Sequence, residues 1–271
     1  MNDQERMKRI SRRSFFWAAA ALGGTYEVWR KLNDSANAAG LIAPLRKGLE
    51  YSQGVWSKAI DPYRKVRTYT EADVTTERLN SFIGMPGNLD AGAWRLAVEG
   101  VYGRTKPVEL TLSEILAMPS LTMTTEFFCI EGWSVIQTFK GVPFVEFMKR
   151  YPPGTLSGKA PDVDGNPDDL SPYVYMETPP KKRGEVASAQ DYSDRPYYVG
   201  LDMRSARHVQ TMLCYEMNGK PLTPEHGAPL RLVIPVKYGV KNIKRIGLIR
   251  YQKTQPGDYW AEQGYDWFAG V

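Results

Sequence analysis

The sequence has few of the residues that build disulfide scaffolds or metal clusters. Its 271 residues include two cysteines, Cys129 and Cys214, and two histidines, His208 and His226. Two cysteines could form one bridge, but they cannot stabilise a disulfide-rich fold. The histidines are too few and too far apart in the sequence to form a metal site of their own. A disulfide scaffold and a zinc-type cluster of cysteine and histidine are therefore excluded.

A strong excess of one charge is also missing. The chain has 35 lysines and arginines against 30 acidic residues, a net charge of +5, most of it in the first fifty residues. No basic stripe alternates with aromatic residues, so nucleic-acid binding is not expected. Hydrophobic residues make up 42% and charged residues 24% of the chain, which is enough to bury a substantial core. The length suits one large domain or two small ones.

The apolar run near the N-terminus is short. The stretch KRISRRSFFWAAAALGG places Arg12-Arg13 before an apolar segment that ends at Gly24. This segment is too short to span a membrane comfortably, and a basic head before it is typical of a secretory signal. Paired arginines match the twin-arginine type, which directs export of proteins that are already folded. We therefore expect a leader over residues 1–40 and a periplasmic protein, with an uncleaved, membrane-associated leader as an open alternative.

Beyond the leader, residues 41–77 are expected to form an arm without sustained periodicity, and residues 78–271 one main domain. Alternating apolar residues predict strands over 94–103 and 121–129. Between them, Thr111 and Glu114 have the spacing of a helical capping box. Further expected elements are a short helix opened by Pro143, a loop over 154–169, strands over 171–178, 230–235 and 242–253, and a hairpin over 210–223 that turns at Asn218-Gly219. These elements favour a sheet-rich α+β domain with short helices.

Cys129 ends one of the predicted strands, in the stretch TTEFFCIEGW, and is followed by Glu131, Gly132 and Trp133. A single thiol is most often a buried core residue, which is how we interpret Cys214. A strand end that leads into a loop is instead a common place for function, and a thiolate there could be a nucleophile or a soft metal ligand. A nucleophile would need a histidine as base. Neither histidine lies in a recognisable protease or transferase motif, and we interpret His208 as structural.

The stretch EHGAPLRLVIPVKYGVKNIKRI, residues 225–246, combines glycines with cations. Gly227 and Gly239 would let backbone amides approach a ligand closely. Arg231 and the lysines offer charge-assisted hydrogen bonds to a phosphate. A solvated basic hairpin is the alternative, but it does not need this arrangement of Gly, Pro, Tyr and Lys between apolar strands. The pattern favours an anion site for a cofactor.

Together, these two stretches resemble the sulfite-oxidase-fold molybdenum enzymes. The resemblance is greatest to the branch of the periplasmic protein-methionine-sulfoxide reductase catalytic subunits. CIEGWS is similar to the Cys-Val-Glu-Ala-Trp-Ser of that branch, and HGAPLRLVIPVKYGVKNIK to its Asn-Gly-Ala-Pro, Arg and Lys-Tyr-Gly-Phe-Lys run. The resemblance covers about residues 80–268. It implies a sulfite-oxidase-type molybdopterin-binding fold with one molybdenum–molybdopterin (pyranopterin dithiolene) cofactor per chain.

The resemblance also implies the residues of the site. Cys129 would be the catalytic residue and the thiolate ligand of molybdenum. His226 stands where the reductase branch has asparagine and the wider family has histidine, and the segment LNSFIG departs from the family motif at Ile83 and Gly84. The further cofactor contacts would be Asn80, Ile83, Gly84, Thr178, His226, Arg231, Asn242, Ile243 and Lys244. Five aromatic residues could either line a pocket or belong to the core and surface: Tyr197, Tyr198, Trp260, Tyr265 and Trp267.

Three functions stay open. The first, which we favour, is a molybdenum-dependent oxidoreductase that transfers an oxygen atom at sulfur and reduces sulfoxides such as protein methionine sulfoxide. The second is oxidation of sulfite, a dianion that needs a positive pocket, whereas Glu131 and Trp133 stand near Cys129 here. The third is a secreted binding module that has lost the metal, against which Cys129 and Arg231 both argue. The sequence has no haem-attachment motif and no dinucleotide motif. The resemblance implies electron supply by a membrane haem-containing, quinol-oxidising subunit.

Overall fold

The computed structural model describes residues 30–31, 37–38, 41–59, 64–80, 83–85, 89–179 and 195–270. The chain divides into two compact units, Met1–Trp56 and Ser57–Val271. The predicted twin-arginine segment lies outside the described residues. In the part that is described, no helix is both long enough and apolar enough to cross a membrane.

A helix that the sequence analysis did not expect begins in the first unit. Strands β1 (Asn37–Ala38) and β2 (Leu41–Ile42) pair antiparallel, and helix α2 (Ala43–Ala59) follows at once. Two glycines, Gly48 and Gly54, lie inside this helix. Each lowers helix propensity by about 1 kcal/mol relative to alanine, which explains why the pattern of this segment did not indicate a helix.

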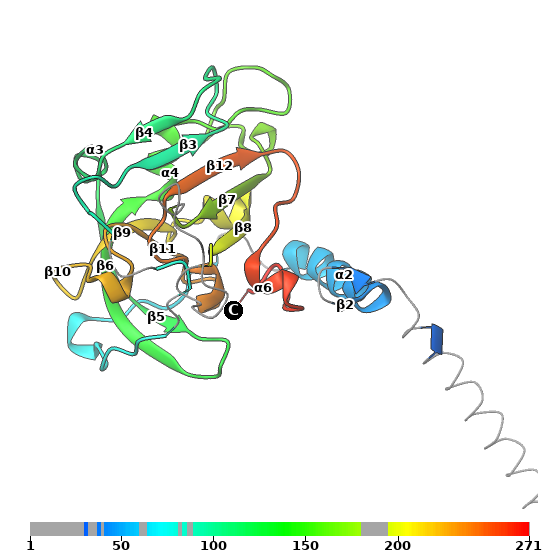
Figure 1. Cartoon of the computed structure of the whole chain (residues 1–271), viewed down its shortest axis with the longest axis horizontal. Coiled ribbons are helices and arrows are strands. Elements are labelled where there is room, and N and C mark those ends of the chain that lie inside the picture. The colour runs from blue at the N-terminus through cyan, green and yellow to red at the C-terminus, as the bar shows by residue number, and fades with distance from the viewer. Residues whose placement is uncertain are drawn as a thin grey trace, which may run out of the picture. The chain divides into compact units, whose positions relative to one another are not determined.

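The second unit is built on two five-stranded sheets, shown in Figure 1. One sheet has the order β10-β9-β6-β5, with β11 also paired to β9, and all its pairs are antiparallel. The other has the order β4-β3-β12-β7-β8, and its β12–β3 pair is parallel. The strands of the first sheet are β5 (Leu121–Phe128), β6 (Ser134–Pro143), β9 (Met212–Met217), β10 (Lys220–Pro221) and β11 (Arg231–Val233). Those of the second are β3 (Leu96–Glu99), β4 (Val108–Leu110), β7 (Tyr173–Glu177), β8 (Tyr198–Asp202) and β12 (Leu248–Gln252).

The helices of the second unit are short, so the predicted sheet-rich α+β class is confirmed. The predicted capping box opens α3, where Thr111 accepts from the backbone of Glu114 and the Glu114 carboxylate accepts from the backbone of Thr111. The helices are α3 (Leu112–Leu116), α4 (Phe144–Arg150), α5 (Met203–Ala206) and α6 (Tyr259–Glu262). Single 3-10 turns are η1 (Glu71–Asp73), η2 (Pro167–Asp169), η4 (Pro224–His226) and η5 (Gly239–Lys241).

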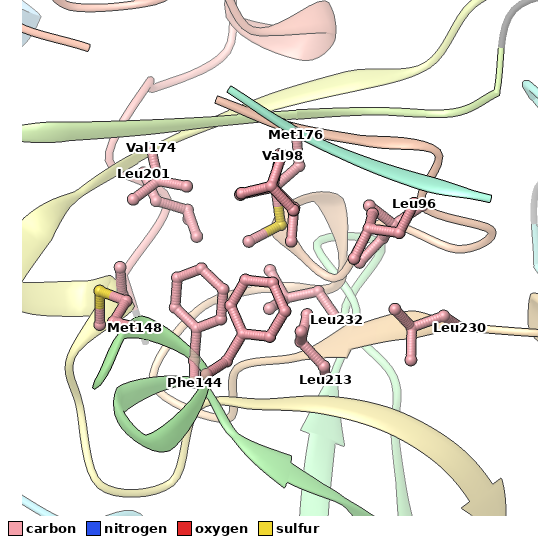
Figure 2. Close-up of a cluster of buried hydrophobic side chains, with 14 of the residues drawn as sticks. Leu96, Val98, Phe144, Met148, Val174, Met176, Leu201, Leu213, Leu230 and Leu232 are labelled. Carbon is pink, nitrogen blue, oxygen red and sulfur yellow. The ribbon is translucent and has the colours of Figure 1, made fainter. Parts of the chain in front are cut away.

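The main core lies where side chains of the two sheets and α4 meet. Figure 2 shows Val98 and Met176 from one sheet and Leu213 and Leu232 from the other, with Phe144 of α4 between them. These five side chains are 0% exposed. Burying a side chain of this size contributes about 1.5–3 kcal/mol. Strands β7 and β12 alternate between buried and half-buried positions, as expected for sheet surfaces that cover a core.

Predicted strands were often longer than the observed ones. The predicted strand over 94–103 ends at Glu99, because Gly100 has a φ of +72° and leaves the sheet. The predicted strand over 242–253 begins only at Leu248. The hairpin at Asn218-Gly219 is confirmed, and both residues have the positive φ of a type I′ turn, 51° and 73°. Strands β6 and β8 were not predicted.

The segment before the main domain is bound to the first sheet. Thr68 bridges to Thr125, and the amide of Tyr69 donates to the carbonyl of Thr124 at 3.0 Å. Further along, the amide of Thr75 donates to the carbonyl of Ile136 at 3.0 Å. Residues 64–77, which we had assigned to the arm, thus run beside β5 and β6 and bring the residues that follow to the end of this hairpin.

Candidate active site

A cavity of about 180 Å³ opens beside the turn that joins β5 to β6. Its walls come from residues 77–80 and Ile83, the β5–β6 hairpin, residues 226–244 and residues 260–265, with single contributions from Tyr197 and Met217. Both stretches that the sequence analysis singled out therefore reach one pocket, although they lie about 100 residues apart in the sequence.

Cys129 lies in the tight turn between the two strands. Its amide donates to the carbonyl of Trp133 at 2.8 Å, and its carbonyl accepts from the amide of Gly132, which has a φ of +87°. The side chain is 6% exposed and lines the pocket. The Nδ2 atom of Asn80 lies 3.4 Å from its Sγ atom. Both cysteines are free. No group of three or more His, Cys, Asp or Glu residues within the described ranges is placed to hold a metal ion.

Trp133 forms a fixed aromatic wall next to Cys129. Its Nε1 atom donates to Oε2 of Glu131 at 2.9 Å. The guanidinium carbon of Arg78 lies 4.5 Å from the centre of the indole ring, and the ring of Phe127 lies at 6.4 Å. A cation over an indole face and a partner for the indole N–H both hold the ring in place. All four residues line the pocket.

Arg231 is a buried cation that faces the pocket. Its side chain is on β11 and is 4% exposed, and burial lowers the pKa of its guanidinium. Nη1 donates to the carbonyl of His226 at 3.3 Å, whereas Nε has no hydrogen-bond partner among the described residues. Its sheet neighbour Cys214 does not supply an anion, because burial raises the pKa of that thiol to about 12. A buried guanidinium in this state is costly unless an anion pairs with it.

Lys244 is a further cation in the pocket lining, and the chain passes close to it at Gly227. Nζ of Lys244 donates to the carbonyls of Asn80 at 2.7 Å and Glu225 at 3.0 Å, and burial lowers its pKa to about 7. An added Cβ on Gly227, which has a φ of +97°, would lie 2.7 Å from Cβ of Lys244. This position therefore requires glycine, because the chain passes so close to the lysine.

Seven of the ten predicted site residues line the pocket: Asn80, Ile83, Cys129, His226, Arg231, Asn242 and Lys244. Asn242 also shapes its own loop, since it accepts from the amide of Ile234 at 2.8 Å and donates to the carbonyl of Tyr238 at 3.1 Å. The structure does not place Gly84, Thr178 and Ile243 in the lining.

Those three residues support the wall from behind. An added Cβ on Gly84 would lie 2.7 Å from the Thr178 side chain, so this turn rests directly on Thr178. Oγ1 of Thr178 accepts from the amide of Tyr197 at 3.1 Å, and Tyr197 does line the pocket. Ile243 is fully buried in the main core. The residues next to them line the pocket: Ile83 beside Gly84, Tyr197 against Thr178, and Asn242 and Lys244 on either side of Ile243.

Of the five aromatic residues that we had left undecided, Tyr197, Trp260 and Tyr265 line the pocket, and Tyr198 and Trp267 do not. Gly239, which the sequence analysis had named for the anion site, also lines the pocket, whereas further lining residues were missed: Glu77, Arg78, Phe127, Gln137, Met217 and Val240. Some of them could have been found from their position in the sequence, because Glu77 and Arg78 stand shortly before Asn80, and Phe127 stands shortly before Cys129.

A buried ion pair connects the segment that contains Asn242 with the segment that contains Trp260, and both segments line the pocket. Nζ of Lys241 lies 2.5 Å from Oδ2 of Asp258, and the two side chains are 1% and 2% exposed. Nζ of Lys241 also donates to the carbonyl of Gly200 at 2.9 Å. Lys241 belongs to η5, beside Asn242, while Asp258 caps α6, which carries Trp260. The pair therefore ties the two walls together.

Comparison with known proteins identifies the family. A family model described as oxidoreductase molybdopterin binding domain matches residues 83–260. A protein of Azospira oryzae, named as a protein-methionine-sulfoxide reductase subunit, is 30% identical over 265 residues, which are 96% of this chain and 88% of that protein. A protein-methionine-sulfoxide reductase catalytic subunit of Xanthomonas axonopodis is 33% identical over 187 residues, which are 68% of this chain but only 53% of that protein.

Among solved structures, the sulfane dehydrogenase SoxCD from Paracoccus pantotrophus matches 62% of this chain and 40% of its own at 19% identity, with a TM-score of 0.46. The family model covers about two thirds of the chain, and the Azospira relative is similar along nearly all of it. The matched range includes Cys129, Arg231 and Lys244. The chain therefore belongs to the family of oxidoreductases that have a molybdopterin binding domain.

Proposed function

We propose that this protein is a molybdenum-dependent oxidoreductase that reduces sulfoxides, including methionine sulfoxide in proteins, with one molybdenum cofactor per chain. The observation that carries the proposal is the meeting of the Cys129 thiol with the buried guanidinium of Arg231 in one pocket. The names of the relatives, which refer to methionine sulfoxide, support the substrate class. The chain spans only about half of the Xanthomonas relative, so the activity of that whole protein is carried over here as a proposal.

The residues of the pocket fit a molybdopterin. The Nε atom of Arg231 is buried without a partner, as expected of a cation that awaits an anionic group such as a phosphate. Arg231 and Lys244 would hold the anionic part of the cofactor, and Cys129 would offer a soft thiolate to its metal. When bound, the cofactor supplies a metal centre that exchanges an oxygen atom and two electrons with sulfur.

The side chains around this centre have defined tasks. Asn80 places an amide N–H against the Cys129 sulfur, and such a hydrogen bond orients a metal ligand and tunes its donor strength. Trp133, held by Glu131 and Arg78, presents an apolar ring that suits a neutral sulfoxide with apolar substituents. Trp260 and Tyr265 add two further aromatic side chains to the lining of the pocket.

Sulfite oxidation is a second candidate, because one observation favours it. The guanidinium of Arg78 lines the pocket next to Trp133, and a cation at this position would attract a dianion. The carboxylate of Glu131 also lines the pocket and opposes such attraction. The neutral sulfoxide meets no such conflict, which is why we place it first.

Steady-state assays of the purified holoenzyme separate these candidates. We expect methionine sulfoxide to oxidise reduced viologen in the presence of the enzyme, and sulfite to give no turnover with a one-electron acceptor. Elemental analysis of the same preparation is expected to give about one molybdenum per chain. Turnover of sulfite without turnover of sulfoxides would contradict our assignment, and protein without molybdenum from a host that makes the cofactor would support a binding module.

The partner and the location of the protein are also proposals. The relatives are named as subunits, which supports a separate electron donor. The sequence has no haem-attachment and no dinucleotide motif, which also favours a separate donor. We assign this role to a membrane haem-containing subunit that oxidises quinol, as the family resemblance implies. Arg12-Arg13 before an apolar run supports export by the twin-arginine route to the periplasm. This route carries folded proteins, so it suits a protein that takes up its cofactor in the cytoplasm.

Replacing both Arg12 and Arg13 with lysine is expected to stop export. The change keeps the charge and the apolar run, so a general secretion route would tolerate it, whereas the twin-arginine receptor would not. Cell fractionation with antibody detection measures the effect, and the wild-type chain in the same host is the control. Equal periplasmic amounts of variant and wild type would contradict this route.

A further inference from the structure

Reduction of a sulfoxide consumes protons as well as electrons. The sulfur–oxygen bond breaks, the sulfur gains two electrons, and the oxygen leaves as water with two protons. The electrons come from a one-electron haem donor or, in an assay, from reduced viologen. The protons come from solvent and must reach a pocket in which Cys129 and Arg231 are buried. The inference that follows rests on the proposed function, because it concerns protons consumed by sulfoxide reduction.

Glu77 and His226 form an acid–base pair between solvent and the pocket. Both residues line the pocket, and Oε2 of Glu77 lies 3.5 Å from Nε2 of His226. The side chain of Glu77 is 47% exposed and that of His226 is 12% exposed. The carboxylate can therefore exchange protons with water directly, whereas the imidazole lies further inside.

Both side chains are held in position by further contacts. Nδ2 of Asn218 donates to Oε1 of Glu77 at 3.1 Å, and Nδ1 of His226 lies 2.9 Å from Oγ1 of Thr223. The threonine engages Nδ1, so Nε2 is the nitrogen that exchanges protons. Its distance to Glu77 is longer than an ordinary hydrogen bond, so one bridging water or a small movement would complete the transfer. A proton on Nε2 stays available to an acceptor in the pocket.

We propose that Glu77 and His226 carry protons from solvent into the pocket, with Nε2 of His226 as the donor to the oxygen that leaves the sulfoxide. The other polar groups of the pocket are less suited to this task. Lys244 already donates to two carbonyls, and the carboxylate of Glu131 accepts from Trp133. The guanidinium groups of Arg78 and Arg231 do not release protons in proteins.

The charges around His226 set its proton affinity. Burial is the largest influence and lowers the pKa of the imidazole, and Glu77, the next largest, raises it. Arg231 and Lys244 lower this pKa further, and Glu225 raises it slightly. Glu77 is therefore the group that does most to raise the pKa of His226 against the effect of burial. Its removal lowers the pKa of His226, so the imidazole loses its proton at a lower pH than in the wild type.

The experiment compares Glu77→Gln with Glu71→Gln in the holoenzyme. Glu71 is exposed at the start of η1, so its variant loses the same charge from the same segment but outside the pocket lining. NMR titration of the imidazoles is readable because the chain has two histidines, and His208 serves as the internal reference. In Glu77→Gln we expect the pKa of His226 to fall by on the order of 0.5–1 unit, with no change in Glu71→Gln.

The same variants are assayed for sulfoxide turnover across the pH range. The donor must be protonated, so we expect the alkaline limb of kcat to move to lower pH in Glu77→Gln by the shift that NMR gives. In His226→Gln we expect a loss of about 10²-fold in kcat. Molybdenum and pterin are measured in every preparation, and rates are expressed per loaded enzyme, so cofactor loss is not mistaken for loss of proton transfer.

An alkaline limb of kcat in Glu77→Gln that coincides with that of the wild type would overturn the relay, whether or not the NMR titration moves. So would His226→Gln with wild-type kcat per molybdenum. A different result would overturn the proposed function instead: wild-type holoenzyme with full cofactor that reduces no sulfoxide at any pH. The wild-type rate in the same series therefore tells the two failures apart.

Discussion

Replacing Cys129 with serine is expected to remove nearly all sulfoxide turnover while the protein still folds. The hydroxyl of serine is a harder and far less acidic ligand than a thiolate, so it would not bind a soft metal site in the same way. Loss of an outer partner of a metal ligand already costs 10–100-fold in affinity or activity, and we expect more than about 10²-fold here. The turn itself depends on backbone hydrogen bonds of Cys129 to Gly132 and Trp133, which serine keeps.

Steady-state rates, molybdenum content and circular dichroism together check this prediction. Cys214→Ser is the matched control, because it makes the same chemical change at a thiol that is fully buried in β9 and outside the pocket lining. The control is expected to lose some stability and to keep its turnover. Wild-type turnover in Cys129→Ser would show that this thiol is not the metal ligand. A folded but inactive Cys214→Ser variant would indicate that Cys214, and not Cys129, is the functional thiol.

Replacing Arg231 with alanine is expected to cost the protein most of its cofactor. Each charge-assisted hydrogen bond to an anion contributes about 1.5–3 kcal/mol. Loss of two such bonds weakens binding by about 10²-fold or more. Lys244→Ala should act in the same direction but more weakly, because a lysine offers a point charge where arginine offers a planar pair of donors. Molybdenum and pterin content per chain after extensive dialysis measures both effects.

Arg245→Ala provides the control for the loss of a buried arginine. The Arg245 side chain is 3% exposed and contacts the carbonyl of Pro224 but does not line the pocket. This variant is expected to lower stability and to keep the cofactor content of the protein that remains folded. Equal cofactor content in Arg231→Ala and wild type would contradict the assignment of Arg231 to the anionic part of the cofactor.

The parts of the site that the sequence predicted are those with local signals. Cys129 followed a recognisable strand and preceded a glycine, and the turn between β5 and β6 has this form. Arg231 stood among apolar residues in a segment rich in glycine and lysine. In both cases the local residue types pointed to a functional position, and the resemblance to a known family then implied the chemistry.

The parts that it missed depend on contacts between distant segments. Glu77 meets His226 across 149 positions of sequence, and Arg78 meets Trp133 across 55. Nothing in the local pattern around Glu77 indicates these partners, because the backbone bonds of residues 64–77 to β5 and β6 bring it there. Strand β6 was overlooked for a similar reason. It contains Gln137, Lys140 and Gly141, which are poor strand signals, and it is stabilised by pairing with β5 and β9 on both sides.

The buried pair of Lys241 and Asp258 has a consequence for how the pocket meets its ligand. Separating the two charges inside the protein would cost about 3–5 kcal/mol, the penalty for a buried ion without its partner. The aromatic wall that follows Asp258 therefore does not swing open as an independent flap. It takes its shape when the chain folds, not when a ligand arrives. The conformational entropy of the Trp260 side chain is lost when the chain folds, so a ligand meets a preorganised surface. Binding then costs less entropy, and more of the contact energy appears as affinity.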